Sequence, residues 1–163
     1  MKITSLQELL LEELKDLYDA EHRILKALPK MVKAASHAEL KQGFELHRTQ
    51  TEQQVQRLEK AFEHLAASAR KKTCEAIKGI LEEGEDLIGT KMEAEVLDAG
   101  LIGAAQKVEH YEIAAYGTVR SWAKQLGLTE VASLMEQTLE EEKQTDQKLT
   151  QLAESMINQE AMA

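Results

Sequence analysis

The chain has 163 residues and a formal net charge of −9, with 43% hydrophobic and only 4% aromatic residues. This length suffices for one domain with a real core, which we expect to span residues 1–163, and the negative charge argues against nucleic acid as a partner. The sequence contains no run of 18 apolar residues and no secretion-signal pattern, so we expect a cytoplasmic protein without a membrane span.

The composition favours helices throughout the chain. Ala, Leu, Glu, Lys and Gln dominate, and one proline with eight glycines leaves few positions at which helices would end. No segment shows the alternation of β-branched residues that is typical of strands, so we predict an all-α fold. The single cysteine, Cys74, excludes an internal disulfide and fits a small core residue better than a reactive thiol.

The first helix is predicted to run from the capping-box pair Ser5 and Glu8 to about residue 35. Pro29 should kink this helix without ending it, because the apolar pattern resumes beyond it. Glu21 interrupts the inner face midway and, taken alone, would most simply lie at the edge of the core. The apolar positions of this face are Leu10, Leu14, Leu17, Ile24, Leu25 and Leu28.

A second capping box, Ser36 with Glu39, predicts the start of the next helix. Its inner face is apolar at both ends but polar in the middle, where His47, Gln50 and Gln54 lie. A single histidine in such a place is more often a hydrogen-bonded core or surface residue than a metal ligand.

A short helix is predicted over about 74–88, and we expect it to cross the end of a bundle. A third capping box, Thr90 with Glu93, predicts a long helix from about 91 to 126, which carries Glu109 and Glu112 one turn apart on its apolar face. An ionised carboxylate buried without a partner costs roughly several kcal/mol. These two side chains therefore need cations or protons, or they lie at a hydrated edge.

The last helix is predicted to begin near Thr129, and residues from about 158 onward should fray. Glu142 lies on its inner face, with Asp146 one turn further on. Glu140 and Glu141 should point to solvent.

Four long helices with a long second connection predict a ferritin-like four-helix bundle, with the short helix crossing between the second and third long helices. Each long helix has polar residues near its middle, which we interpret as one shared site. Without metal, that many carboxylates could not all stay ionised in a dry core. The predicted metal ligands are Glu21, His47, Gln50, Glu109, Glu112, Glu142 and Asp146.

The charges of these ligands indicate which cofactor they would bind. Five carboxylates carry −5, and two divalent ions supply +4, with water or hydroxide adjusting the balance. Carboxylates with one imidazole suit iron or manganese better than zinc, so we predict two iron or manganese ions. If the helices are rotated from the expected orientation, His22 and His110 become alternative ligands.

Four segments of the sequence resemble the YciE/YciF-type ferritin-like stress-response proteins of bacteria. The third of them, DAGLIGAAQKVEHYEIAAYG, is the specific one. The family is similar in fold to rubrerythrin, and the resemblance implies a homodimer with a di-iron or di-manganese centre. The segments are Leu17–Glu21, His47–Gln54 with Arg57 and Leu58, Asp98–Gly117 and Thr138–Thr150.

The resemblance also assigns individual ligands, with one departure. Rubrerythrin's ligands on the first, third and fourth helices match Glu21, the pair Glu109 and Glu112, and Glu142. The second helix of such sites usually carries Glu followed three residues later by His, but here Gln50 stands at the glutamate position. The imidazole of His47 precedes it, and the fourth helix lacks a Glu-x-x-His motif as well. One of the two metals therefore has a weaker ligand set.

The leading hypothesis is a dimetal carboxylate protein that handles peroxide, dioxygen or iron during stress. Because no cysteine cluster supplies a rubredoxin-type electron donor, rubrerythrin-like chemistry would need an external reductant. Tyr18, Tyr111 and Tyr116 are interpreted as packing residues, with one-electron relay as the alternative. The rival hypothesis is a metal-free helical interaction or structural protein, which predicts Glu21 and Glu142 in solvent or paired with lysines. An iron-storage cage is a third, weaker interpretation.

Overall fold

The computed structural model describes residues 2–163, and within this range it contains helices and no β-strand. Four helices are long, namely α1 (Leu6–Ala34), α2 (Ala38–His64), α4 (Ala94–Gln125) and α5 (Thr129–Leu152). A shorter helix, α3 (Glu75–Gly89), lies between the second and third of them in the sequence. The prediction of an all-α four-helix bundle with one additional short helix is confirmed.

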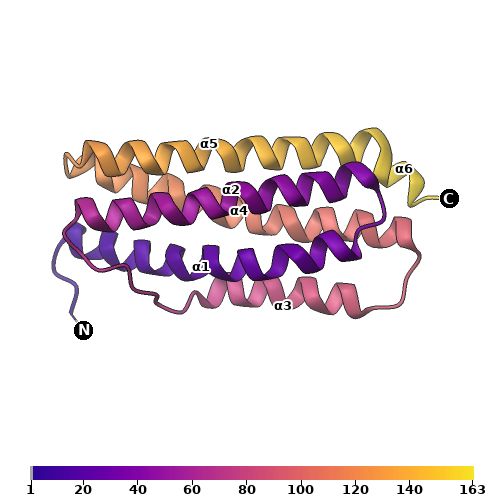
Figure 1. The fold of residues 1–163 in the computed structure, drawn as a ribbon, viewed down its shortest axis with the longest axis horizontal. Helices are drawn as coiled ribbons and strands as arrows, with labels where there is room; N and C mark the ends of the chain where they lie inside the picture. Colours follow the sequence, from indigo (N-terminus) through magenta and orange to yellow (C-terminus); the bar gives the residue numbers. More distant parts are fainter. Residues whose placement is uncertain (1) are drawn as a thin grey trace.

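The connections explain the position of α3. In Figure 1, α1 and α2 run in opposite directions, and so do α4 and α5, whereas α2 and α4 run in the same direction. The chain between α2 and α4 must therefore return along the whole length of the bundle, and α3 forms this return. The expectation that the short helix crosses the end of the bundle was wrong, because α3 lies lengthwise against α1 and α4, outside the ring of four long helices.

One glycine lets α3 approach α4 closely. A Cβ atom added at Gly100 of α4 would lie 2.9 Å from Leu87 Cδ2 of α3, closer than real Cβ contacts. Ile77 of α3 is fully buried, in the same apolar cluster as Leu101 and Ile102 of α4. The apolar face of α3 is thus packed onto the outside of the bundle.

In only one of the three predicted capping boxes does the predicted first residue cap its helix. Ser5 caps α1 by accepting from Glu8 N, and the Glu8 carboxylate accepts from Thr4 N rather than Ser5 N. The N-cap of α2 is His37, and that of α4 is Glu93. Thr90, predicted to open α4, is the C-cap residue of α3.

The start of α2 is held by a carboxylate from a distant part of the chain. The buried Asp98 of α4 accepts hydrogen bonds from Ser36 N (2.8 Å), His37 N (2.8 Å) and the Ser36 hydroxyl. These bonds satisfy backbone donors that a local capping box would otherwise satisfy. The contact also ties the α1–α2 turn to the N-terminal part of α4.

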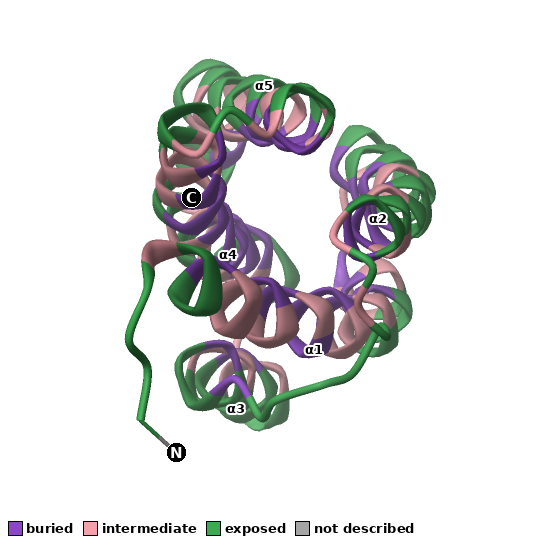
Figure 2. Ribbon diagram, turned by 90° about the vertical axis from the view of Figure 1, so that its left-hand side faces the viewer, coloured by how far each residue is buried: buried purple, intermediate pink, exposed green. Residues whose placement is uncertain are grey.

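The core consists of two apolar clusters separated by a polar layer. One cluster contains Ile24, Leu28, Phe44 and Leu101, among others, and the other surrounds Phe62. Figure 2 shows that the inward faces of the four long helices are the buried ones. The buried polar residues Glu21, His47, Gln54, Glu109, Glu112 and Glu142 lie along their helices between the members of the two clusters.

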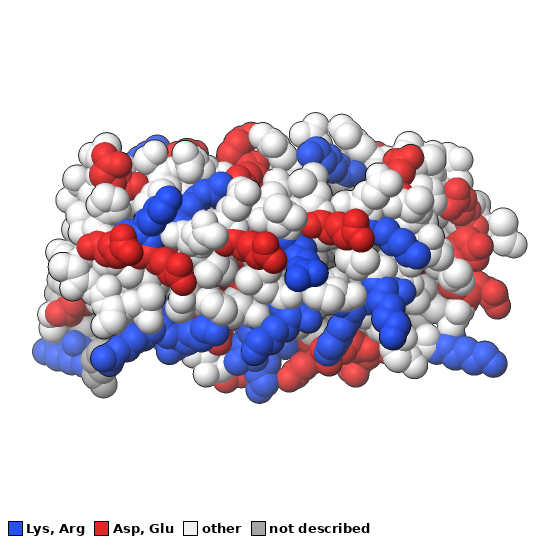
Figure 3. Space-filling view, in the orientation of Figure 1, with Lys and Arg blue, Asp and Glu red and all other residues white. Residues whose placement is uncertain are grey.

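The C-terminal end of the chain is helical in the structure. A π-helical turn (Ala153–Ile157) continues α5 into the short α6 (Asn158–Glu160), and fraying from about residue 158 stays a prediction. As expected, α1 does not end at Pro29. Despite the negative net charge, Lys and Arg side chains form a band over the α1 and α3 side of the molecule (Figure 3), where Arg23, Lys26 and Lys30 border a surface hollow. No helix within residues 2–163 has the length and apolar character to cross a bilayer.

Candidate metal centre

Three helices bring four potential metal ligands together in the polar layer. His47 comes from α2, Glu109 and Glu112 come from α4, and Glu142 comes from α5. One ligand atom of each lies within 4.8 Å of the others, and all four side chains are buried. The fourth long helix, α1, adds the fully buried Glu21, which interacts with Glu112 and Glu142. Five of the seven predicted ligands are therefore neighbours in the structure.

The imidazole of His47 lies between carboxylates from two other helices. Its Nδ1 is 3.0 Å from Glu109 Oε1, and its Nε2 is 3.7 Å from Glu142 Oε2. On the opposite side of the layer, the hydroxyl of Tyr116 donates a hydrogen bond to Glu21 Oε1. This bond orients one carboxylate, whereas the others have few protein donors.

Most of the polar atoms that face one another in this layer have no hydrogen-bond partner. They include both carboxylate oxygens of Glu109 and of Glu112, one oxygen of Glu21 and of Glu142, and Nε2 of His47. Buried polar atoms are normally hydrogen-bonded, and each exception requires a reason. Carboxylate oxygens and an imidazole nitrogen that converge without donors are the donor set that iron or manganese prefers. The residues present fit a bound metal.

Proximity and burial change the acidity of these carboxyl groups. Burial, reinforced by the charge of Glu142, raises the pKa of Glu21 to about 8, and burial raises the pKa of Glu109 to about 7. The pKa values of Glu112 and Glu142 are also well above the ordinary range, because both groups are buried and face neighbouring carboxylates. In the metal-free protein these buried carboxyl groups therefore retain protons to higher pH than exposed carboxyl groups do.

Two predicted ligands lie elsewhere. Asp146 is turned toward the edge between α4 and α5, where it accepts from Gln106 Nε2 (3.1 Å) and lies 3.2 Å from His110 Nε2. Gln50 lies beside His47 at the wall of a surface groove and is only partly buried. In the structure, Asp146 is therefore not among the convergent side chains, and Gln50 lies at the groove wall beside them; whether either residue binds a metal stays a prediction.

The alternative histidines are also outside the site. His110 is largely exposed, with 69% of its side chain accessible. The Nδ1 atom of His22 lies 2.7 Å from the carbonyl oxygen of Tyr18 in its own helix. The helix rotation assumed from the apolar pattern was therefore correct.

Gln54 is the residue of the site that sequence reasoning did not select. Its Nε2 donates to Glu142 Oε1 and to Glu141 Oε2 (3.1 Å). Arg57, one turn further along α2, holds the same Glu141 carboxylate through both terminal nitrogens, at 2.7 and 2.6 Å. Glu141 thus faces α2 rather than solvent, and it links the arginine to the buried amide. The helical pattern of the sequence does indicate this residue, because it places Gln54 on the inner face of the second helix.

Replacing Gln54 with leucine should destabilise the metal-free protein by about 1–3 kcal/mol. The leucine removes the only amide that donates to the buried Glu142 carboxylate among residues 2–163. The measurement is urea unfolding of both proteins in the presence of a chelator. Gln53→Leu is the matched control, since Gln53 is exposed on the same helix. Equal stability of the two variants would contradict the role of the Gln54 amide.

The other two tyrosines and the cysteine lie away from the layer. The Tyr111 hydroxyl donates to Asp16 Oδ2 (2.8 Å) and lies 3.1 Å from Cys74 Sγ, and Tyr18 donates to Glu59 (2.9 Å). Burial raises the pKa of the Cys74 thiol to about 11, so it is protonated at neutral pH. Cys74 is a buried residue at the start of α3, in agreement with the interpretation as a small core residue.

Comparisons with known proteins identify relatives over nearly the whole chain. The sequence profile of a family described as a domain of unknown function, DUF892, matches residues 5–162. The chain is 41% identical to the protein YciF of Escherichia coli (strain K12) over 162 residues, which cover 99% of this chain and 98% of YciF.

Solved structures agree with the sequence comparison. The crystal structure described as that of the E. coli stress protein YciF matches with a TM-score of 0.92, covering 96% of this chain and 99% of that one at 41% identity. YcfI of Rhodopseudomonas palustris matches with a TM-score of 0.89 at 40% identity, covering 91% and 95%. Because the family profile and YciF both cover nearly the whole chain, the protein belongs to the DUF892 family, that of the YciF-type stress proteins.

Proposed function

We propose that this protein is a dimetal carboxylate protein of the stress response, which handles peroxide, dioxygen or iron at a buried di-iron or di-manganese centre. The observation that carries the proposal is the set of buried carboxylate oxygens that face one another without donors. The residues that would hold the metals are Glu21, His47, Glu109, Glu112 and Glu142.

The charge of this set supports two divalent ions. With Asp146 outside the site, four carboxylates remain, and their charge of −4 when ionised equals the charge of two divalent cations with opposite sign. An uncompensated set of buried charges is strongly unfavourable, whereas bound cations remove both the repulsion and the protons. The single imidazole leaves one ion with a poorer ligand set than the paired Glu-x-x-His arrangement of related bundles.

The bundle supplies a dry and oriented site for such chemistry. Reduction of hydrogen peroxide breaks the O–O bond and consumes two electrons and two protons to give two waters, and metal ions held by these residues would supply the electrons. The Tyr116 hydroxyl holds the Glu21 carboxylate in place. The apolar clusters on either side exclude bulk water. An external thiol or reduced electron-transfer protein would return the electrons.

Two further properties belong to the proposal. The family resemblance supports a homodimer in the cytoplasm, which molar-mass measurement in solution would test. The metal centre itself lies within one chain, because all five proposed ligands come from α1, α2, α4 and α5 of the same molecule.

Metal content is the direct test of the proposed function. Protein purified without chelator or affinity tag should contain iron or manganese, approaching two ions per chain after anaerobic loading. Glu112→Ala should lose most of this metal and, with it, peroxide consumption. Glu140→Ala, at an exposed position of α5, should retain both.

A metal-free structural role is the second candidate function. It is favoured by the single histidine of the site, and YcfI is described as a presumed structural protein. Its prediction that Glu21 and Glu142 face solvent disagrees with their complete burial. Wild-type protein that takes up neither Fe(II) nor Mn(II) would decide for the structural role.

A further inference from the structure

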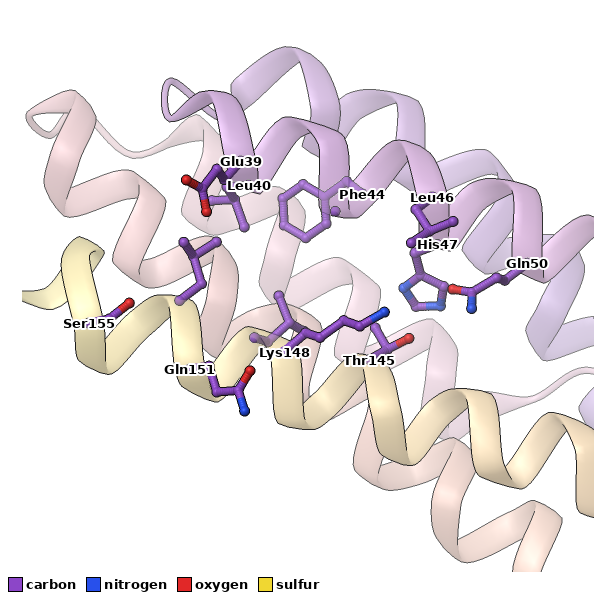
Figure 4. A pocket seen from close by; sticks show the side chains of 13 residues that line it. Glu39, Leu40, Phe44, Leu46, His47, Gln50, Thr145, Lys148, Gln151 and Ser155 are labelled. Atoms are coloured by element: carbon purple, nitrogen blue, oxygen red, sulfur yellow. The ribbon is translucent and has the colours of Figure 1, made fainter.

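A groove on the surface leads to the buried histidine of the site. It lies between the N-terminal half of α2 and the C-terminal half of α5 and encloses a cavity of about 330 Å³. Figure 4 shows His47 and Gln50 at one end of the groove and Ser155 at the other. The volume is at the small end of the range for ligand pockets, about 300–1,000 Å³.

The middle of the groove is apolar, its His47 end is polar, and Glu39, Gln151 and Ser155 add polar side chains toward the opposite end. Phe44 and Leu40 line it from α2, and Leu149 and Leu152 line it from α5. The polar end is formed by Gln50, Thr145 and Lys148, and Figure 4 shows the Lys148 side chain extending toward His47.

His47 lines the groove at its polar end and is only 3% exposed. Its Nε2 is buried, lies 3.7 Å from Glu142 Oε2 and has no hydrogen-bond partner. The groove therefore ends on a ligand of the proposed metal centre. Hydrogen peroxide or dioxygen would need no leucine- and phenylalanine-lined approach of this size. A larger molecule with an apolar body and an oxygen-bearing head matches both parts of the groove.

We propose that this groove binds an organic hydroperoxide, with its alkyl or aryl body against Phe44 and Leu149 and its hydroperoxide group directed to His47. The inference rests on the proposed function and specifies its substrate class. Lys148 and Gln50 donate hydrogen bonds to the head group. Reduction of such a molecule breaks its O–O bond and takes up two electrons and two protons, giving an alcohol and water. Metal ions held by the proposed ligands would supply the two electrons, and an external thiol, oxidised to its disulfide, would restore them.

A glycine in the wall allows the groove to be closed selectively. Gly43 lies in α2 and lines the groove, and a Cβ atom added there would meet nothing within 4 Å. Gly43→Leu should therefore fold and project its side chain into the groove, since leucine is also the better helix former. Gly103→Leu is the matched control, because Gly103 is an exposed helical glycine of α4 with equally open surroundings.

Binding can be measured without metal, so that it does not depend on the proposed function. The probe is 2-phenyl-2-propanol, the unreactive alcohol that corresponds to cumene hydroperoxide, titrated into metal-free protein while backbone amide NMR signals are followed. Signals of Phe44, Leu149 and Gln151 should shift and saturate. Gly43→Leu should weaken binding at least about tenfold, equivalent to 1.4 kcal/mol. Gly103→Leu should bind as the wild type does.

Several results would overturn the inference while leaving the metal centre intact. One is saturable metal uptake with no probe binding, and another is equal probe binding by both leucine variants. Binding of benzoate in preference to the alcohol would identify a carboxylate site instead. In metal-loaded protein, Gly43→Leu should slow consumption of cumene hydroperoxide at least about tenfold and leave that of hydrogen peroxide unchanged. An equal loss with both peroxides would also refute it.

Discussion

The metal-free protein should lose stability as the pH rises from about 4.5 to 8 and should regain it when Fe(II) or Mn(II) is added. The four buried carboxyl groups have an ordinary pKa of 4.5 in the unfolded chain and raised values in the folded one, about 7 for Glu109 and about 8 for Glu21. Between these limits the folded state binds more protons than the unfolded state, so the free energy of unfolding falls as pH rises. The loss should be on the order of several kcal/mol.

Chelator-treated protein, unfolded by urea at intervals between pH 5 and 8.5, provides the measurement. Metal replaces the protons on the carboxyl groups and becomes a stronger stabiliser as pH rises, so the slope with pH should flatten or reverse in its presence. Stability that rises between pH 5 and 8 without metal would contradict the burial of these groups as acids. Metal that shifts the curve equally at every pH would mean that it binds elsewhere.

The positions of the long helices and of the polar layer could be predicted from the sequence, because the apolar pattern that identifies a helix repeats over many turns. Small errors in rotation leave such a pattern unchanged. Glu21, Glu109, Glu112 and Glu142 interrupt otherwise apolar faces, so their burial together was predictable once the helices were assigned to one bundle. The structure therefore confirms the fold and the convergence of these four side chains.

Whether a residue at the edge of the site points into it depends on its angle around the helix axis, to within a few tens of degrees. Gln50 follows His47 by three residues, about 60° around the helix, and Gln54 follows by seven, about 20°. Glu109 and Glu112 have the same three-residue spacing and both belong to the layer, so the angle favours Gln54 without excluding Gln50. The family alignment favoured Gln50. Asp146 is about 40° from Glu142 by the same reasoning, and its contacts with Gln106 and His110 hold it at the edge.

Contacts between distant segments could not be predicted from local patterns. Ser36 and Glu39 have the spacing of a capping box, yet the donors at the start of α2 bind Asp98, which lies 62 residues further along the chain. The direction of α3 likewise depends on α2 and α4 running the same way, which only the assembled bundle shows.

Glu112→Gln should make the metal-free protein more stable and, at the same time, abolish its response to metal. The amide is neutral without binding a proton, so it removes the cost of neutralising this buried group, which should add a few kcal/mol to the free energy of unfolding at pH 8. A wild-type protein saturated with Mn(II) at about 100 times its Kd gains about 2.7 kcal/mol, and the variant should lose most of this gain because both Glu112 oxygens belong to the convergent ligand set. Urea unfolding at pH 8, with chelator and with excess Mn(II), measures both effects. Glu95→Gln, at an exposed position of the same helix, should change neither.

Opposite signs for the two effects are the signature of a site whose charges are retained for a cation at the expense of stability. A Glu112→Gln variant that is stabilised in a protein whose wild type ignores Mn(II) and Fe(II) would instead assign the carboxylates to a metal-free scaffold.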